Sequence, residues 1–326
     1  MRLAEAAEQY LAVRAHQVAR TTVIGDRHCI DSLKAGLGAS VNMSHITSDD
    51  LEQFFYGPDG YLGRAVPVAA STFNVYLARV RGFFKYCRAK GWTDQDPFLL
   101  IQRKRLTKKD RLRLTAAEVL RCLDLADSPR DRAALAIAAN TAMRSSELAA
   151  LRIRDVDLRA GSVLVRVTKS RLEDWMPITS DLDAELRAWF LTYQEECGPL
   201  HPDWYVIPSR NFHAGTLNTR PCEPVGRVAD IAQKVLAALG YPTYQEGFHT
   251  IRRSVARIYF DMLSADGVDS ALIATASLLH HADTVTTLRY IGLKPEEERR
   301  DTRLRGNPFL TSLVQQGHVV SIARKV

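Results

Sequence analysis

The stretch SVLVRVTKSRLEDWMPIT, residues 162–179, is the one clear β signal in the second part of the chain. It predicts two short strands joined by a polar turn, with Lys169 at the end of the first strand. Around it, apolar residues recur at helical spacing. Helices are predicted over 180–196, 225–239, 249–263, 269–280 and 283–290. The sequence therefore predicts a mainly α domain with a small β-sheet, an α+β fold, over residues 114–326.

The first hundred residues predict a separate, all-helical domain over 1–102. Helices are expected over 3–17 and 22–37, from residue 48 onward, and over 71–90. One stripe of the last helix is apolar and is assigned to the core: Phe73, Leu77, Val80, Phe84 and Cys87. A second stripe carries Asn74, Arg81, Lys85 and Arg88. This second stripe is either an ordinary solvated face or a surface that lies along DNA.

A basic run, RKRLTKKDRLR, joins the two predicted domains over residues 103–113. It holds seven cations and one anion, 7 − 1 = 6, so it supplies six of the seven net positive charges of the chain. Positive charge of this kind favours a polyanionic partner such as nucleic acid. Such a run is usually a solvated linker, and here it is predicted to be both a linker and a strap on DNA phosphates. Its cations are Arg103, Lys104, Arg105, Lys108, Lys109, Arg111 and Arg113. A capping box of Thr115 and Glu118 follows it.

The bulk composition excludes several classes of protein. At 326 residues, 46% apolar and 25% charged, the chain has the length of two globular domains. No apolar run approaches the ~20 residues that span a membrane, and acidic residues inside the first helix argue against a signal peptide. Five scattered cysteines indicate reduced thiols, with neither disulfides nor a zinc site. We expect a cytoplasmic, nucleoid-associated protein without a metal or cofactor.

A spaced set of cations, histidines and one tyrosine carries the chemistry. Arginines and a lysine can neutralise a phosphate, histidines can hydrogen-bond it or move protons, and a tyrosine hydroxyl can attack it. The set indicates phosphoryl transfer through a covalent tyrosine, with cationic side chains in place of a metal ion. Its members are Arg144, Lys169, His249, Arg252, His281 and Tyr290.

Each member also has a plain structural interpretation. Arg144 and Glu147 are spaced for a surface salt bridge, or for an arginine held at a helix start and aimed at phosphate. Lys169 on a turn is most often exposed and idle. One HxxR match is what chance gives for this composition. Tyr290 could equally be a half-buried core tyrosine, so only the order and local context of the set give it weight.

Four segments, taken in order, strongly resemble the tyrosine recombinase family of phage integrases and chromosome-dimer resolvases. They are TAMRSSELAAL at 141–151, the strand pair with its lysine, HTIRRS at 249–254, and LLHHADTVTTLRY at 278–290. The resemblance covers the whole catalytic half. The helical N-terminal domain and the basic linker also look like the core-site DNA-binding domain of that family.

Matched residue by residue, the resemblance implies a role for each member of the set. Arg144 is similar to the first phosphate-binding arginine, and Glu147 to the acidic residue that supports it. Lys169 matches the lysine of the β-hairpin. His249 and Arg252 match the HxxR pair. The remaining two matches are His281, the histidine of the LGH motif, and Tyr290, the nucleophile nine residues later.

Two positions depart from the family pattern. His280 stands where the family usually has glycine, a small residue that would let the start of the next helix pack closely. This departure leaves open which histidine faces the phosphate, and the nine-residue spacing selects His281. Residues 141–143 read TAM where TGL is commoner, a change that is conservative in size and expected to be without consequence.

The resemblance implies that Tyr290 attacks a DNA phosphodiester and leaves a 3′-phosphotyrosine and a free 5′-hydroxyl. Arg144 and Arg252 would hold the non-bridging oxygens, with a hydrogen bond from His281. His249 is the candidate base and Lys169 the candidate acid. Strand exchange between two duplexes implies a homotetramer. The tail at about 296–326 is expected to dock on a neighbouring protomer, or on its own domain, through Phe309, Leu310, Leu313 and Val314.

The function expected is integration and excision of a phage or mobile element, or resolution of chromosome or plasmid dimers. The chain begins directly with the helical domain, as expected for a simple site. Double-stranded DNA is the expected partner, together with directionality or host accessory proteins. Three alternatives stay open: a type IB topoisomerase-like relaxase, a DNA-binding regulator without activity, and a metal nuclease that uses His280 and His281.

Overall fold

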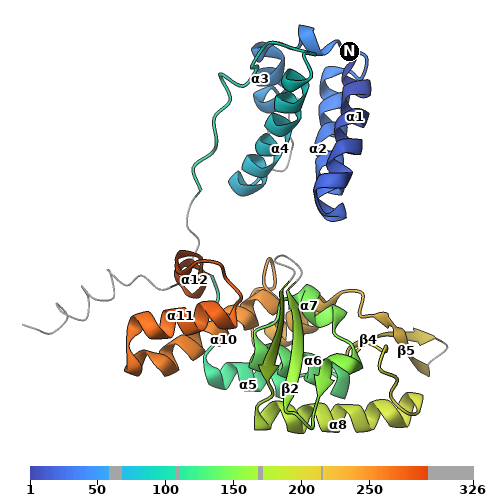
Figure 1. Ribbon diagram of the computed structural model, residues 1–326, viewed down its shortest axis with the longest axis vertical. Helices are drawn as coiled ribbons and strands as arrows, with labels where there is room; N and C mark the ends of the chain where they lie inside the picture. Colours follow the sequence, from blue (N-terminus) through green and yellow to red (C-terminus); the bar gives the residue numbers. More distant parts are fainter. Residues whose placement is uncertain (59–67, 107–110, 168–171, 214–215, 293–326) are drawn as a thin grey trace, which may run out of the picture. The chain divides into compact units, whose positions relative to one another are not determined.

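The structure is a computed structural model and describes residues 1–58, 68–106, 111–167, 172–213 and 216–292 (Figure 1). The chain divides into two compact units, Met1–Lys109 and Asp110–Val326. The division falls inside the basic segment 103–113 that the sequence suggested as a linker. Lys108, Lys109, Lys169 and the tail 296–326 lie outside the described residues.

Apart from an isolated β-bridge between Arg2 and Asn42, the regular secondary structure of the first unit's described residues is helical. Its helices are α1 (Leu3–Gln17), α2 (Arg20–Leu37), α3 (Ser48–Tyr56) and α4 (Ala70–Ala89). Their bounds differ from the predicted ones by at most two residues. α3 begins where the Thr47 side chain accepts a hydrogen bond from the backbone of Asp50, a satisfied N-cap. The four predicted helices of this domain are therefore confirmed.

The apolar stripe of α4 forms the centre of this unit. All five of its residues, Phe73, Leu77, Val80, Phe84 and Cys87, are at most 2% exposed. The Phe73 ring meets Phe55 edge-to-face at 5.6 Å between centroids, a geometry that the ring quadrupoles favour. The stripe was correctly assigned to the core.

The second stripe of α4 has a structural task that the sequence did not indicate. The Asn74 side-chain amide donates to the Lys104 carbonyl and accepts from the Lys104 backbone N–H, each at 2.8 Å. The Arg81 guanidinium donates to the carbonyl of Ile101 at 2.7 Å and lies 5.4 Å from the centre of the Phe98 ring. These two residues hold the segment 98–104 along α4. Lys85 and Arg88, one and two turns further along, are exposed.

The second unit contains, in its described residues, eight α-helices and two small antiparallel sheets. The helices are α5 (Ala116–Asp124), α6 (Pro129–Thr141), α7 (Ser145–Ala150), α8 (Ser180–Cys197), α9 (Val228–Ala238), α10 (Phe248–Leu263), α11 (Val268–Leu278) and α12 (Thr284–Ile291). The strands are β1 (Val156–Asp157), β2 (Ser162–Val167), β3 (Leu172–Pro177), β4 (Pro208–His213) and β5 (Thr216–Pro224). The predicted fold class, mainly α with a small sheet, is confirmed.

The predicted strand pair is present as β2 and β3, with Ser162 opposite Pro177 and Val167 opposite Leu172. The short β1 joins them on the far side of β2, in the order β1-β2-β3. The hairpin β4–β5 was not predicted. It lacks apolar alternation, and polar contacts attach it to α8: Arg210 donates to Glu196 at 2.6 Å and lies 5.1 Å from the centre of the Trp189 ring.

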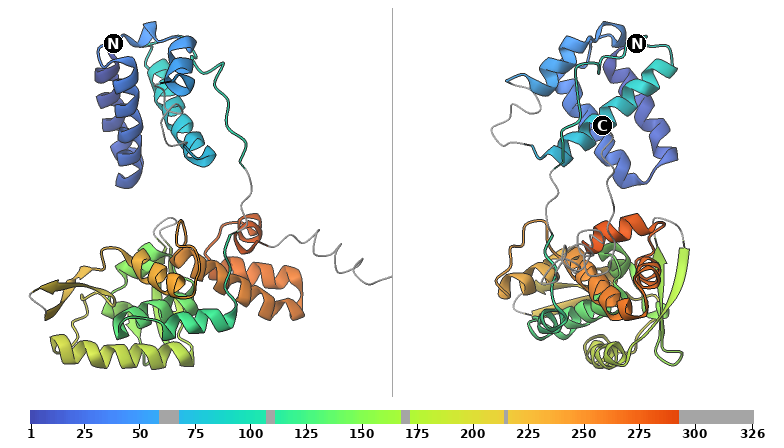
Figure 2. Two further views of the ribbon diagram at one scale, coloured as in Figure 1. Left: turned by 180° about the vertical axis from the view of Figure 1, so that it is seen from behind. Right: turned by 90° about the vertical axis from the view of Figure 1, so that its left-hand side faces the viewer.

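Helix α6 runs through the core of the second unit and was also not predicted. Every residue from 133 to 138 is buried, so the helix has no polar face and its sequence shows no amphipathic stripe. Helices α10 and α11 lie side by side in Figures 1 and 2. The C-terminal ends of α6 and α11 and the start of α10 bring together the segments on which the candidate site is built.

The C-terminal end of the basic segment is attached to α10. The backbone N–H of Leu114 donates to the Ser254 hydroxyl at 2.8 Å, and Arg253 donates to the Leu112 carbonyl at 3.1 Å. The Arg113 guanidinium lies over Gly292, which follows α12 with a φ of 69°. The left-handed conformation favours glycine there, and a Cβ would meet the guanidinium at 2.0 Å and displace this flexible side chain. No helix in the described part of the chain has the length and apolar character needed to cross a membrane.

Candidate active site

Two helices, α10 and α12, carry three residues of the predicted set. Helix α10 begins after Gly247 and carries His249 and Arg252 in its first turns. Helix α12 begins where the Asp283 carboxylate accepts a hydrogen bond from the backbone of Thr286 at 2.6 Å, and it carries Tyr290 near its end. Because α10 packs against α12, the tyrosine faces the start of α10.

Arg252 is fixed by the ends of two other helices. It is only 2% exposed, and burial lowers the pKa of its guanidinium, which nevertheless stays protonated. It donates to the carbonyl of Ala142 at the end of α6, and to the carbonyl of Leu279 at the end of α11 at 2.6 Å. Helix C-termini leave carbonyls unpaired and carry partial negative charge. Two helix ends thus hold a buried positive charge in one orientation.

Arg144 converges on the same place. It caps the start of α7, and Glu147 accepts from its guanidinium at 2.7 Å and from its backbone N–H at 2.8 Å. The Glu147 side chain is 1% exposed and that of Arg144 22%, so this is not a surface salt bridge. A second guanidinium nitrogen lies 3.5 Å from the Leu279 carbonyl. Both arginines are therefore anchored on Leu279, and the interpretation of a supported arginine at a helix start is the one that the geometry favours.

Tyr290 lies among these cations. Its ring meets His281 edge-to-face at 5.4 Å and has the Arg252 guanidinium carbon 6.0 Å from its centre. Its hydroxyl donates to the backbone carbonyl of His249 at 3.3 Å. Burial raises the pKa of the phenol, against the opposing effect of the guanidinium groups. The hydroxyl is therefore protonated at neutral pH and would need a base to become a nucleophile.

His281 is held by a residue that the sequence did not indicate. Its Nδ1 lies 3.0 Å from the hydroxyl of Thr287, which is fully buried one turn before Tyr290. Desolvation and the charges of Arg252 and Arg144 lower the pKa of His281 to about 4. At neutral pH the imidazole is uncharged and can act as a hydrogen-bonding group toward an anion.

His280 points elsewhere. Its Nε2 lies 2.9 Å from the Asp174 carboxylate on β3, whereas His281 contacts Tyr290. The selection of His281 by spacing therefore matches the geometry. In the described ranges no three His, Cys, Asp or Glu side chains are grouped closely enough to hold a metal.

Both departures from the family pattern, Ala142 and His280, fall at positions with an unusual backbone conformation. His280 has a φ of 49° and Ala142 a φ of 50°, the left-handed region. Glycine suits both positions because of backbone conformation. The change at Ala142 has a conformational consequence, although we expected none.

We predict that Ala142→Gly stabilises the protein by about 1 kcal/mol, because glycine removes the left-handed strain while keeping the carbonyl that Arg252 uses. Ala134→Gly, inside the same α6, should instead destabilise it by about 1 kcal/mol. The free energy of unfolding in urea measures both. A destabilising Ala142→Gly would show that the strain at this position is negligible.

Comparison with known proteins identifies the family. The model of the phage integrase family matches residues 112–297. A putative integrase/recombinase y4rF of Sinorhizobium fredii is 29% identical over 70% of this chain and 52% of its own length. The tyrosine recombinase XerC of Xanthomonas axonopodis pv. citri is 28% identical over 69% of this chain and 68% of its own length. The chain thus spans about half of the first relative and two thirds of the second.

Solved structures agree in fold. A lambda integrase dimer bound to a COC′ core site matches with a TM-score of 0.64 and 18% identity, over 95% of this chain and 98% of that one. A lambda integrase tetramer bound to a Holliday junction matches with a TM-score of 0.65 and 19% identity, over 89% of this chain and 77% of that one. The chain belongs to the phage integrase family, the tyrosine recombinases, as its motifs predicted.

Proposed function

We propose that this chain is a site-specific DNA recombinase that cuts and rejoins strands through a tyrosine–DNA ester. One observation carries the proposal: Tyr290 packs against the Arg252 guanidinium and a neutral His281, and Arg144 is held at the same Leu279 carbonyl as Arg252. Such a group of fixed donors suits a phosphate whose negative charge grows during attack.

In the proposed reaction, the Tyr290 oxygen forms a bond to phosphorus and the bond from phosphorus to the 5′-oxygen breaks. The phenolic proton passes to His249, whose backbone the hydroxyl already touches. Contacts of this kind are often looser without substrate than with it. Lys169 supplies a proton to the departing 5′-oxygen. Arg144 and Arg252 hold the non-bridging oxygens with planar donor pairs.

The products are a 3′-phosphotyrosine and a free 5′-hydroxyl, so the ester keeps the bond that rejoining requires. A 5′-hydroxyl from a second duplex can then attack the ester and release Tyr290 without ATP. Exchange of both strands of two duplexes requires four tyrosines, hence a homotetramer. The fold likeness to lambda integrase, solved as a tetramer on a Holliday junction, supports this assembly.

Integration and excision of a mobile element is the biological role that we favour, since one of the relatives is a putative integrase/recombinase. Resolution of chromosome or plasmid dimers is the second candidate, and the likeness to XerC favours it. In either role the partner is double-stranded DNA of the nucleoid. Accessory or directionality proteins are expected to act with it.

The test uses a DNA site selected from random duplexes by capture on the immobilised protein. The site is resynthesised as a series of duplexes with a nick moved one base at a time, so that a short cleaved strand diffuses away. We expect a covalent protein–DNA band at one or two nick positions, without added metal or nucleotide. Binding without any covalent band would identify the chain as a DNA-binding regulator. Plasmid relaxation without strand exchange would identify a relaxase.

The pH dependence of cleavage follows from His249. Its pKa is lowered from 6.5 by desolvation and by the neighbouring guanidinium groups, of which Arg252 is the strongest. A base must be unprotonated, so lowering its pKa extends its use toward acid. We predict that the cleavage rate is flat near neutral pH and falls only below pH 6.5. Single-turnover rates measure this, and His249→Gln should remove the fall. A decline centred at or above pH 6.5 would exclude His249 as the base.

Residues 103–105, the N-terminal part of the basic segment, give a prediction for affinity. Arg103, Lys104 and Arg105 are exposed, and we propose that they contact DNA phosphates. Replacing all three with Gln should weaken binding to every sequence and flatten the slope of log affinity against log salt by about 2–3. The matched control replaces three exposed arginines of the second unit, Arg121, Arg159 and Arg187. Equal slopes for the two triple variants would show that the segment is not a phosphate strap.

A further inference from the structure

The imidazole of His280 joins two parts of the second unit that are far apart in sequence. Its Nε2 lies 2.9 Å from the carboxylate of Asp174 in the middle of β3. The His280 side chain is 9% exposed, whereas that of Asp174 is 51% exposed. A contact with one solvated partner contributes little to stability. Its effect is therefore to fix the position of Asp174 relative to residue 280.

Two local features make His280 unfavourable where it stands. Its φ of 49° is a conformation that glycine adopts at no cost. Its Nδ1 is buried, with no hydrogen-bond partner among the described residues, and an unpaired buried nitrogen is destabilising. Glycine would avoid both features. The contact with Asp174 is what glycine could not make, and strain of this kind points to a functional constraint.

On one side of the contact stands the hairpin of β2 and β3. Asp174 pairs with Val165 of β2, so a hold on Asp174 acts on both strands. The segment that connects these strands contains Lys169, five residues before Asp174 in the sequence. A contact at Asp174 therefore restrains β3 directly and β2 through its pairing with β3.

On the other side stand the two neighbours of His280. The Leu279 carbonyl accepts from Arg252 at 2.6 Å and lies 3.5 Å from Arg144. The His281 ring contacts Tyr290. Leu279 thus contacts the two arginines, His280 contacts the hairpin, and His281 contacts the tyrosine.

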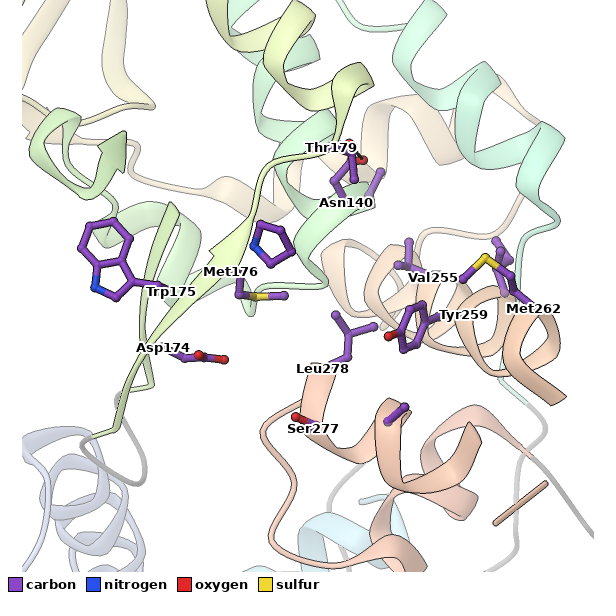
Figure 3. Close-up of a pocket in the computed structure, with 14 residues that line it drawn as sticks. Asn140, Asp174, Trp175, Met176, Thr179, Val255, Tyr259, Met262, Ser277 and Leu278 are labelled. Carbon is purple, nitrogen blue, oxygen red and sulfur yellow. Dashed lines mark hydrogen bonds between the residues drawn. The ribbon is translucent and has the colours of Figure 1, made fainter. Parts of the chain in front are cut away.

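Apolar packing does not fix this spacing by itself. A pocket of about 570 Å³ separates β3 from α10 and α11, and it is lined by Asp174, Met176 and Leu278 among others (Figure 3). The Asp174 carboxylate points from β3 toward the end of α11 (Figure 3). Where side chains leave space between two elements, the elements can shift. A polar bridge at the rim of the pocket restricts that movement.

We propose that His280 is a positioning residue for leaving-group protonation: through Asp174 it sets strands β2 and β3 relative to the two arginines. The proposed acid, Lys169, lies between these two strands in the sequence. This inference rests on the proposed strand cleavage. The reaction step that depends on this positioning is the transfer of a proton from the Lys169 ammonium to the 5′-oxygen as the bond from that oxygen to phosphorus breaks. Formation of the bond between the Tyr290 oxygen and phosphorus does not depend on the position of the hairpin.

A substrate with a different leaving atom separates leaving-group protonation from attack by Tyr290. A duplex with sulfur in place of the bridging 5′-oxygen releases a thiolate. A thiol ionises near pH 8.5, whereas an alcohol ionises far above neutral pH, so sulfur leaves without an acid. A defect confined to protonation therefore disappears with the sulfur substrate, and a defect in the arginines or in Tyr290 persists.

We would measure single-turnover formation of the covalent adduct on the oxygen and the sulfur versions of the nicked duplex. His280→Gly and Asp174→Ala are each expected to be roughly 10- to 100-fold slower on oxygen and close to the unsubstituted protein on sulfur. Asp174→Asn retains an acceptor oxygen and should recover most of the rate. Glu173→Ala is the matched control, because Glu173 contacts Arg166 on the same hairpin and not His280.

The thermal midpoint of His280→Gly should equal or exceed that of the unsubstituted protein, since strain is removed. If this variant fails to fold, Asp174→Ala carries the test alone, because Asp174 is half exposed. Equal losses on both substrates, or no loss on oxygen, would overturn the proposal. An unsubstituted protein that forms no adduct with either substrate would instead refute the proposed recombinase function.

Discussion

Tyr290→Phe is expected to abolish the covalent protein–DNA adduct completely while DNA affinity stays within about twofold. The substitution removes one oxygen, which donates a 3.3 Å hydrogen bond to the His249 carbonyl and interacts with the Arg252 guanidinium. The ring contacts with His281 and Arg252 remain. The imidazole and guanidinium groups of the set have no hydroxyl that could replace it, so chemistry should be lost without loss of fold.

The measurement is a denaturing gel of the nicked-duplex reaction, paired with a binding titration of the same duplex. Tyr244→Phe is the matched control, because Tyr244 is 83% exposed, and it should form the adduct at the normal rate. A covalent band from Tyr290→Phe would show that another residue is the nucleophile and would remove the basis of the proposed mechanism.

Arg252→Lys is expected to slow cleavage by about 10²–10³-fold, the usual effect of losing one fixed donor to a developing anion. Two different nitrogens of the guanidinium donate hydrogen bonds to two helix ends, one to the Ala142 carbonyl and one to the Leu279 carbonyl. An ammonium is a point charge on a flexible stem and cannot keep both contacts and still face a phosphate. Charge is conserved in this variant, so geometry alone is tested.

Arg257→Lys provides the comparison for this variant. Arg257 lies on the same helix α10, and its guanidinium contacts Asp261 at the surface. It should cleave at the normal rate. Unfolding in urea, measured for both variants, separates a lost donor from a lost fold. Near-normal cleavage by a folded Arg252→Lys would refute the assignment of this residue as part of a phosphate clamp.

The candidate set could be proposed from the sequence because each member belongs to a local pattern. His249 and Arg252 lie three residues apart on one helix, and Glu147 follows Arg144 by the same interval. The spacing from His281 to Tyr290 is likewise local. Helical stripes and the capping box of Thr115 and Glu118 indicated helices, since short-range spacing is what a sequence records directly.

What anchors the set could not be predicted in this way. The Arg252 guanidinium is held by the carbonyls of Ala142 and Leu279, and a backbone carbonyl has no signature in the choice of side chain. The hairpin β4–β5 and the buried helix α6 lack the alternation or the polar face that would have revealed them. The contact of His280 with Asp174 spans more than a hundred residues.

The sequence alone therefore determined which chemical groups the protein has, which helices carry them and which family it belongs to. Only the tertiary structure decided that the ends of α6 and α11 meet at Arg252, and that His280 and Ala142 are in the left-handed conformation. The physical reason is one of range. Periodicity and capping act within a few residues, whereas the orientation of a buried guanidinium depends on where distant helices end after the core has packed.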